Sequence, residues 1–227
     1  MLYLPTIGSK LSGSLGGITA SRGRGGGYFR SRVVPTDPNT ERQGQVRQNF
    51  AALTIEWKDK LSAAQRTAWG VFATNSPLPN RIGEVRAIPA LAWYIKANSI
   101  RILADRAQVD NAPATFGLAA LDAPDNLLIE AGNDLSFILA PGNGWATSVQ
   151  GSLLVFVSPP QNPGVEFYKG PFQFAGQVNG AVIPPTGIQL FTTPNVQSAG
   201  QKVFVRLVAT QADGRPTNEI ILSGLVT

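Results

Sequence analysis

Cysteine and histidine are both absent from the 227-residue sequence. Without cysteine the chain has no disulfide bond, no thiolate nucleophile and no sulfur ligand for a metal. Without histidine it lacks the most common general base, so Ser-His and Cys-His catalytic arrangements are excluded, together with a zinc site of the usual composition. We therefore expect a protein that is not an enzyme and that holds no metal and no cofactor.

Charge and long apolar runs are also scarce. Charged residues make up 15% of the chain, against about 25% in typical proteins, whereas hydrophobic residues make up 43%. This balance favours a folded protein whose surface is covered in part by neighbouring molecules. No apolar run approaches the roughly 20 residues that span a bilayer, and the N-terminus lacks the pattern of a signal peptide. We expect no membrane association, and a protein made in a cytoplasm-like compartment.

The net charge of +5 is unevenly distributed along the chain. Residues 1–112 contain 15 basic and 7 acidic side chains, whereas residues 113–227 contain 4 and 7. A change of composition and charge sign suggests more than one domain. We predict four parts: a Gly/Arg-rich extended arm or β-hairpin (1–37), a helical domain (38–109), a linker (110–126) and a β-sandwich domain (127–227).

The stretch "SLGGITASRGRGGGYFRSRVVP", residues 14–35, contains no acidic residue. Within it, "GGITASRG" and "GYFRSRVV" are typical of two short extended runs around a Gly/Arg turn, which predicts a hairpin or an extended arm. In the second run Tyr28, Arg30 and Arg32 share one side, and Phe29 lies on the other. The arm can therefore present two different faces to a partner.

Three helices are expected after the arm. "TERQ" at Thr40 and "SAAQ" at Ser62 are capping boxes, each of which marks a helix N-terminus, and Pro89 is well placed to open a third helix. The apolar residues of the first helix recur at helical spacing, which predicts a face turned toward the core: Val46, Phe50, Leu53 and Trp57. The core is completed by Trp69, Phe72 and Trp93, with Leu91, Ile95 and Ile102 packed on the tryptophan cluster.

Beyond the linker the hydrophobic period changes to two. About seven short apolar runs are separated by Pro, Gly and Asn clusters, and "GND" is predicted as the turn of the first hairpin. This pattern favours an antiparallel β-sandwich of the fibronectin type III or immunoglobulin kind. The fold class expected is α+β: an extended arm or β-hairpin, a unit of about three helices and a C-terminal sandwich.

No catalytic group stands out among the remaining residues. The glycines around Arg24 do not have the spacing of a phosphate-binding loop, and a strand-like run follows them in place of a helix. The acidic residues of the β region occupy positions where a turn or an exposed strand face would place them in any case: Glu130, Asp134, Glu166 and Glu219. We interpret them as solvated surface.

Nucleic acid is a second candidate partner. Five basic residues and no acidic one precede Pro35, and two aromatic side chains could stack on bases. The same arginines suit ion pairs and carbonyl contacts with a neighbouring subunit equally well. Binding to nucleic acid would weaken steeply with salt, which distinguishes the two interpretations.

The order of these features resembles a family of poorly characterised proteins of tailed bacteriophages and prophages, regarded as virion structural components. The resemblance rests on "GSLGG", "SRGRGG", an aromatic-Arg-x-Arg strand, "VPTDPNT", "FAAL…W" and "LSAAQRTAW", over roughly residues 12–73. It implies a protein of the virion, made in the host cytoplasm, with other virion proteins and further copies of itself as partners. It supplies no catalytic residue.

The expected function is therefore that of a structural virion protein that assembles through its arm and helices. A capsid-associated place (cement, decoration or head–tail connector) is favoured over a tail or baseplate place, with nucleic-acid binding by the arm as the alternative. A third alternative, a carbohydrate-binding sandwich or a glycosidase, rests on fold analogy alone. Contact residues are predicted at Arg22, Arg24, Tyr28, Phe29, Arg30 and Arg32, and glycines that allow close backbone approach at Gly16, Gly17, Gly25, Gly26 and Gly27.

Overall fold

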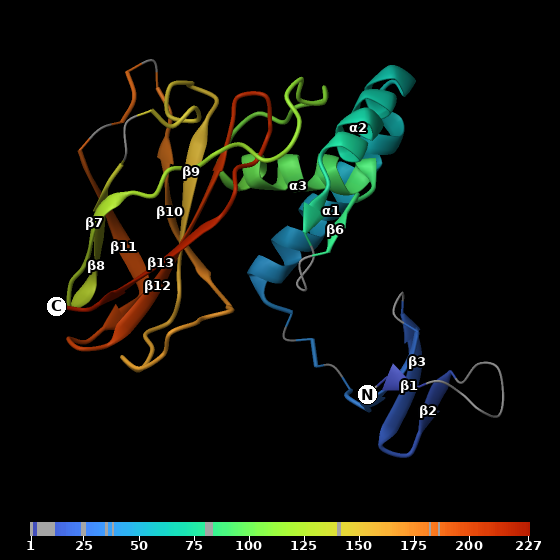
Figure 1. Cartoon of the computed structure of the whole chain (residues 1–227), viewed down its shortest axis with the longest axis horizontal. Helices are drawn as coiled ribbons and strands as arrows, with labels where there is room; N and C mark the ends of the chain where they lie inside the picture. The colour runs from blue at the N-terminus through green and yellow to red at the C-terminus, as the bar shows by residue number, and fades with distance from the viewer. Residues whose placement is uncertain are drawn as a thin grey trace. The chain divides into compact units, whose positions relative to one another are not determined.

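The structure is a computed structural model, shown in Figure 1. It divides into two compact units, Met1–Gly44 and Gln45–Thr227, which are described separately. The residues that it describes are 2–3, 12–23, 26–34, 36–37, 39–79, 84–139, 142–181, 183–185 and 187–227.

The first unit is a small antiparallel sheet with the strand order β1-β4-β3-β2. Its strands are β1 (Leu2–Tyr3), β2 (Gly13–Leu15), β3 (Ile18–Gly23) and β4 (Gly26–Ser31). The two extended runs predicted from the sequence correspond to β3 and β4, and the structure adds a short strand on each side of them.

Three helices follow the arm; the first two begin where the capping boxes predict, and the third begins directly after Pro89. They are α1 (Glu41–Asp59), α2 (Ala63–Asn75) and α3 (Ala90–Leu103), with a short pair of strands, β5 (Leu78–Pro79) and β6 (Val85–Arg86), before α3. The backbone N–H of Gln43 donates to the Thr40 hydroxyl at 3.3 Å and the Thr40 N–H donates to the Gln43 side chain, which completes the first box. Ser62 and Gln65 make the same reciprocal pair before α2. Both predicted capping boxes are confirmed.

Aromatic rings fill the core between the helices. Trp69, Phe72, Trp93 and Tyr94 are buried, and Trp57 packs against them. The Phe72 and Trp93 rings meet edge to face, with their centroids 5.1 Å apart. The expectation that the three helical tryptophans are core residues is confirmed.

The buried face of α3 differs from the prediction. It runs through Trp93, Tyr94, Ala97, Asn98 and Arg101. The predicted isoleucines of this helix pack at the margin of the core. Two polar side chains therefore lie where the hydrophobic pattern predicted none.

Seven strands form the predicted C-terminal sandwich. They are β7 (Asp125–Ile129), β8 (Gly132–Ile138), β9 (Ser152–Val157), β10 (Gln173–Asn179), β11 (Ile188–Gln197), β12 (Lys202–Thr210) and β13 (Ile220–Leu225). One sheet has the order β11-β8-β7 and the other β10-β9-β12-β13. The fourth strand therefore joins the sheet of the third strand, unlike the immunoglobulin constant arrangement. The first hairpin turns around Gly132, between the paired residues Ile129 and Leu135, and the Glu130 N–H donates to the Asp134 carbonyl at 3.0 Å across it, so the predicted "GND" turn is confirmed to within one residue.

The two sheets enclose one apolar core and meet at both pairs of edges. Leu135, Phe137, Val155 and Val205 are among the buried core residues. At one edge the N–H of Thr227 donates to the Ile129 carbonyl at 2.9 Å, and that of Ala131 donates to the Thr227 carbonyl at 2.9 Å. At the other, the Asn195 amide donates to the Gln173 side chain at 2.9 Å, and Gly176 lies against the Phe191 ring.

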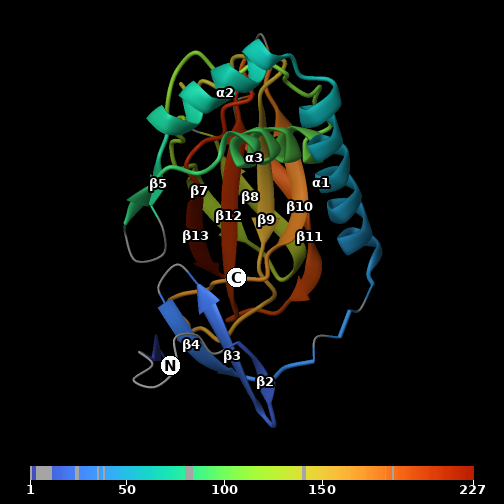
Figure 2. The ribbon, with the colours of Figure 1, turned by 90° about the vertical axis from the view of Figure 1, so that its right-hand side faces the viewer.

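Helix α3 joins the helices to the sandwich. Figure 2 shows it crossing in front of β12, β9 and β10. Arg101 is only 2% exposed, and its guanidinium donates to the Gln211 carbonyl at 2.8 Å and to the Gln150 carbonyl at 3.3 Å. Arg106 donates to the Ser152 hydroxyl at 2.8 Å, and Gln177 donates to the Ala104 carbonyl at 3.2 Å. Polar contacts therefore fix the helices against the sheet.

Tyr94 makes the stability of this core sensitive to alkaline pH. Its hydroxyl donates to the Glu56 carboxylate at 3.2 Å. The pKa of Tyr94 is raised above its ordinary value of 10.0. Burial is the largest cause, followed by the negative charge of Glu56, the hydrogen bond to Glu56 and the charge of Asp110. In the unfolded chain tyrosine ionises near pH 10, so the folded state holds its proton where the unfolded state releases it.

We predict that the stabilisation by Tyr94 is complete below pH 9 and falls as the pH rises through 10. The loss should reach about 1.4 kcal/mol between pH 9 and pH 11. It is measured as the difference between wild type and Tyr94→Phe in urea unfolding across this range. A Glu56→Gln variant should retain most of the fall, because burial is the largest cause. A wild-type profile parallel to that of Tyr94→Phe would contradict the prediction.

Candidate assembly interface

The arm sheet is built on a glycine turn. Gly16 has φ = +57°, a left-handed conformation that other residues adopt at a cost, and it joins β2 to β3 with Leu15 opposite Ile18. The N–H of Arg32 donates to the Gly17 carbonyl at 2.8 Å, which continues the ladder past the end of β4. Gly16 therefore serves a tight turn, and a Cβ added there would have no neighbouring atom within 4 Å.

Strand register divides the predicted contact residues between two faces. Side chains of directly paired residues share a face. Thr19 pairs with Arg30 and Ser21 with Tyr28, so Arg30 and Tyr28 lie on one face, where the hydroxyls of Ser14 and Thr19 lie 2.8 Å apart. Ile18 pairs with Leu15 and Ser31, Ala20 with Phe29, and Arg22 with Gly27, so the other face carries Leu15, Ile18, Phe29 and Arg22. The six residues therefore do not form one patch.

The side chains of the first unit whose burial the structure describes leave both faces of the sheet partly exposed. None of these side chains is buried, and Leu15 is 88% exposed. A sheet that is hydrophobic on one face must bury that face against another element. This sheet has four strands and an apolar face, but none of its described side chains is fully buried. A partner that covers the face would supply the missing burial.

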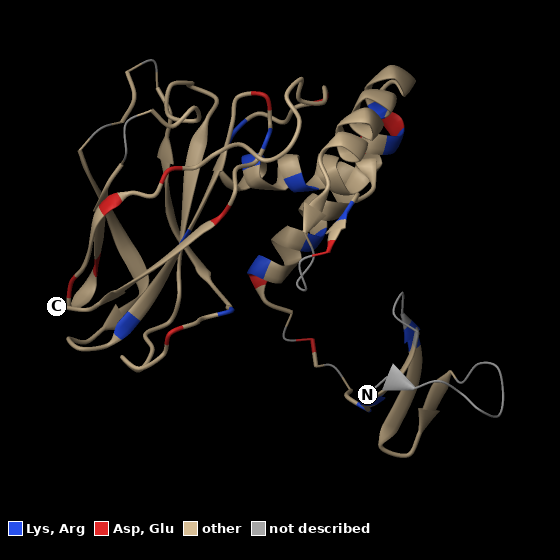
Figure 3. Ribbon diagram, viewed as in Figure 1, with Lys and Arg blue, Asp and Glu red and all other residues tan. Residues whose placement is uncertain are grey.

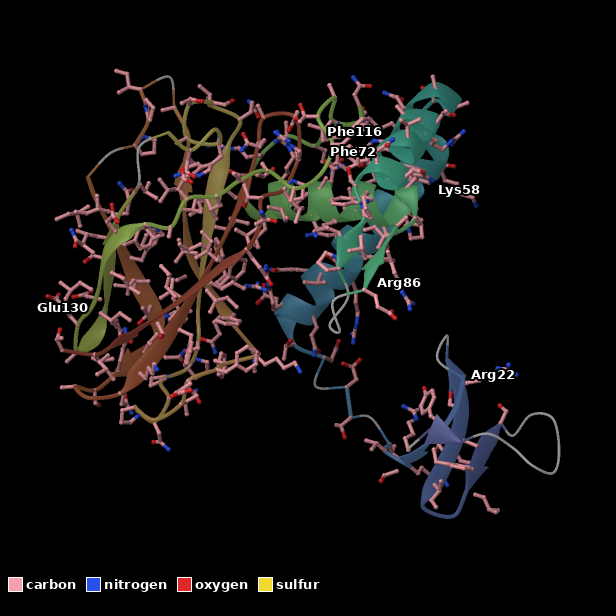
Figure 4. The ribbon with its side chains drawn as sticks, viewed as in Figure 1. Arg22, Lys58, Phe72, Arg86, Phe116 and Glu130 are labelled. Atoms are coloured by element: carbon pink, nitrogen blue, oxygen red, sulfur yellow. The ribbon has the colours of Figure 1, made fainter. Side chains whose placement is uncertain are left out.

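The structure describes most of the predicted arm residues. Arg22, Arg30 and Arg32 are exposed, and Figure 4 shows Arg22 projecting from the arm. Tyr28 and Phe29 are half-buried. Gly26 and Gly27 pair with Gly23 and Arg22 in the ladder. Arg24 and Gly25, also predicted, lie outside the described residues.

Further exposed apolar residues lie on α1. Val46 and Phe50, predicted to face the core, are 53% and 56% exposed. Leu53 and Trp57, on the same stripe, do reach the aromatic core, so only the C-terminal half of the stripe is covered. Phe116 packs on Phe72 at the margin of this core, with the ring centroids 6.2 Å apart. Both side chains are labelled in Figure 4. The apolar spacing of α1 predicted the helix correctly but not the extent of its burial.

The sandwich carries an exposed apolar group that was not predicted from the sequence. Ile188 and Leu190 on β11 are 65% and 78% exposed, and Leu128 on β7 is also exposed. Leu190 and Leu128 both pair with Ser136 of β8, so these side chains share the outer face of the three-stranded sheet. The signal was present in "GIQLFTT", where apolar residues on both faces of one strand indicate that both faces are covered in the functional state.

The acidic residues singled out from the sequence are the candidates for metal ligands or acid–base pairs. No group of three or more acidic residues in the described chain is placed to hold a metal ion. The carboxylates considered from the sequence are all exposed. Glu130 and Asp134 lie beside each other across the first hairpin, where the Glu130 N–H donates to the Asp134 carbonyl at 3.0 Å, whereas Glu219 lies 3.7 Å from Arg206 and Glu166 lies in the segment between β9 and β10. None of the described helices has the length and apolar character needed to cross a membrane.

The comparisons with known proteins find no relative of this chain. A scan against models of protein families finds no match, and a search of the curated proteins finds no match either. The function of this chain is therefore inferred from its own residues and their placement.

Proposed function

We propose that this chain is a non-enzymatic structural protein of a bacteriophage particle, which assembles in many copies through its N-terminal arm. The observation that carries the proposal is the four-stranded arm sheet in which no described side chain is buried. Such a sheet gains its missing burial from another subunit. Within the particle a capsid-associated place is proposed ahead of a tail or baseplate place.

The distribution of apolar residues supports an assembly role. Exposed apolar side chains on α1 and on the outer face of β11 add to those of the arm. Large exposed apolar patches mark contacts with other proteins, because a monomer in water gains nothing from them. The arginines of the arm suit bridges to carboxylates and carbonyls of a neighbour.

Deletion of residues 1–36 tests this proposal. Both hydrophobic cores are formed by residues after Gly44, and the Thr40 cap of α1 is retained, so the truncated chain should fold with its thermal unfolding midpoint within a few degrees of wild type. It should, however, be absent from particles. The measurement is mass spectrometry of gradient-purified particles from a host that supplies either the full-length or the truncated chain.

Three outcomes distinguish the alternatives. If the truncated chain enters particles normally, the arm does not anchor it, and if the full-length chain is absent from particles, the virion role is wrong. If nuclease treatment or moderate salt releases the full-length chain, nucleic-acid binding by the arm becomes the better explanation. Cross-links to capsid or to tail subunits in intact particles would decide its place.

A further inference from the structure

The outer face of the three-stranded sheet is an exposed surface with a regular pattern. Leu135 and Phe137 of β8 point into the core, so their neighbours Asp134, Ser136 and Ile138 lie on the outer face. Ile188 pairs with Ile138, Leu190 with Ser136, and Thr192 with Asp134. Along β11 this face therefore presents three cross-strand rows: apolar side chains at Ile188 and at Leu190, and then the acidic Asp134 beside Thr192. We call it the β11 face.

The β11 face has charge of one sign only. There is no Lys or Arg between residues 107 and 168, nor between residues 170 and 201, so β7, β8 and β11 contain no basic residue. The acidic residues on or beside these strands are Asp125, Glu130 and Asp134, and Figure 3 shows red segments along β7 and β8. A partner that covers this face is expected to bring apolar and basic side chains.

One face of the arm has the opposite composition. Leu15, Ile18 and Arg22 lie together on it, and the chain contains no acidic residue before Asp37. Ile18 and Arg22 are four residues apart on β3. We call it the Ile18 face.

We propose that the Ile18 face of one copy docks on the β11 face of a second copy of this chain. This inference deepens the proposed function and rests on it for the assembly of many copies. The apolar rows at Ile188 and Leu190 receive Leu15 and Ile18, and Arg22 reaches Asp134.

The spacing of the two surfaces supports this alignment. A strand rises about 3.3 Å per residue, so four residues span about 13 Å. That span separates Ile18 from Arg22 on the arm, and it also separates the Ile188 row from the Thr192–Asp134 row on the sandwich. Two sheets can pack face to face with their side chains interdigitated. The apolar and charged ends of one surface therefore meet their counterparts on the other.

A charge exchange in the full-length chain tests the contact. Arg22→Asp and Asp134→Arg should each weaken self-association by about tenfold, because each places like charges opposite one another. The double variant Arg22→Asp/Asp134→Arg should restore the dissociation constant to within about threefold of wild type. Sedimentation velocity over a range of protein concentrations at low salt measures all four proteins.

Matched controls come from the opposite faces. Arg30→Asp makes the same charge change on the other face of the arm, and Glu166→Arg makes the same change away from the β11 face; neither should weaken association more than about twofold.

The apolar part of the contact is tested separately. Leu190→Ser should weaken association about tenfold, because a leucine side chain would lose its burial. Ile221→Ser, on the outer face of the other sheet, should leave it unchanged. Circular dichroism confirms that each variant is folded.

Several results would overturn the proposal. These are a wild-type chain that stays monomeric at every concentration, a double variant as weak as the single variants, or controls that weaken association equally. A charge exchange that alters the protection of the arm without altering the molecular mass would indicate docking within one chain, which also overturns it. Failure of the proposed function is separate: it is absence from particles, whatever the purified chain does.

Discussion

Replacing Arg101 with methionine is expected to lower the free energy of unfolding by about 3–5 kcal/mol. The side chain is 2% exposed, and its guanidinium donates to the backbone carbonyls of Ala107, Gln150 and Gln211. Methionine fills part of the volume but donates no hydrogen bond, so these carbonyls lose a partner in a place that water cannot reach. Urea unfolding followed by tryptophan fluorescence measures the change.

The loss should be specific to this position. Arg106→Met removes a single hydrogen bond, from its Nε to the Ser152 hydroxyl, and should cost about 1 kcal/mol. Arg101→Lys keeps the charge but cannot reach carbonyls in three directions at once, so an intermediate loss is expected. An Arg101→Met variant as stable as Arg106→Met would show that the buried guanidinium does not hold the helices to the sandwich.

Replacing Gly151 with alanine is expected to cost at least about 3 kcal/mol. A Cβ at this position would lie 2.0 Å from the carbonyl oxygen of Trp145, whose side chain is buried in the sandwich core. The obstacle is backbone, and the Gly151 carbonyl itself accepts a hydrogen bond from the Gly180 N–H at 3.0 Å. The segment from Trp145 to Gly151 must therefore move away from β9 to make room. Thermal and urea unfolding measure the effect.

Gly70 provides the matched control. It lies inside α2, and a Cβ added there would have no neighbouring atom within 4 Å, so Gly70→Ala should stabilise the chain by about 0.5–1 kcal/mol. The same chemical change is thus expected to have opposite signs at two glycines. Equal effects at both positions would mean that close approach at Gly151 is not the reason for a glycine there.

The elements of this fold were predictable because their signals are local. Capping boxes at Thr40 and Ser62 marked two helix starts through bonds between residues three apart, and alternation of apolar residues marked the strands of the sandwich. The first hairpin turn was predictable for the same reason, because Gly132, the first residue of "GND", has φ = +106° at the centre of the connection between the paired residues Ile129 and Leu135.

The burial of particular side chains was less predictable, because it depends on contacts between distant segments. Arg101 follows Ala97 by four residues and so lies on the buried face of α3, but two of its carbonyl partners, Gln150 and Gln211, lie 49 and 110 residues further along the chain. Val46 and Phe50 follow the helical spacing, yet no described segment covers them. The arm residues were found from composition, and only strand register separates Arg22 from Arg30.

The pairing of sheet edges in the sandwich has a consequence for a protein present at high concentration. Open edges expose unpaired backbone groups that recruit strands from other molecules and begin aggregation. Here the β7 edge bonds to the C-terminal Thr227 after β13, and the β10 and β11 edges lie against each other. The edges of one sheet therefore lie beside those of the other, which leaves less room for a strand of another molecule to add to them, and the side chains on the outer faces remain open to a partner.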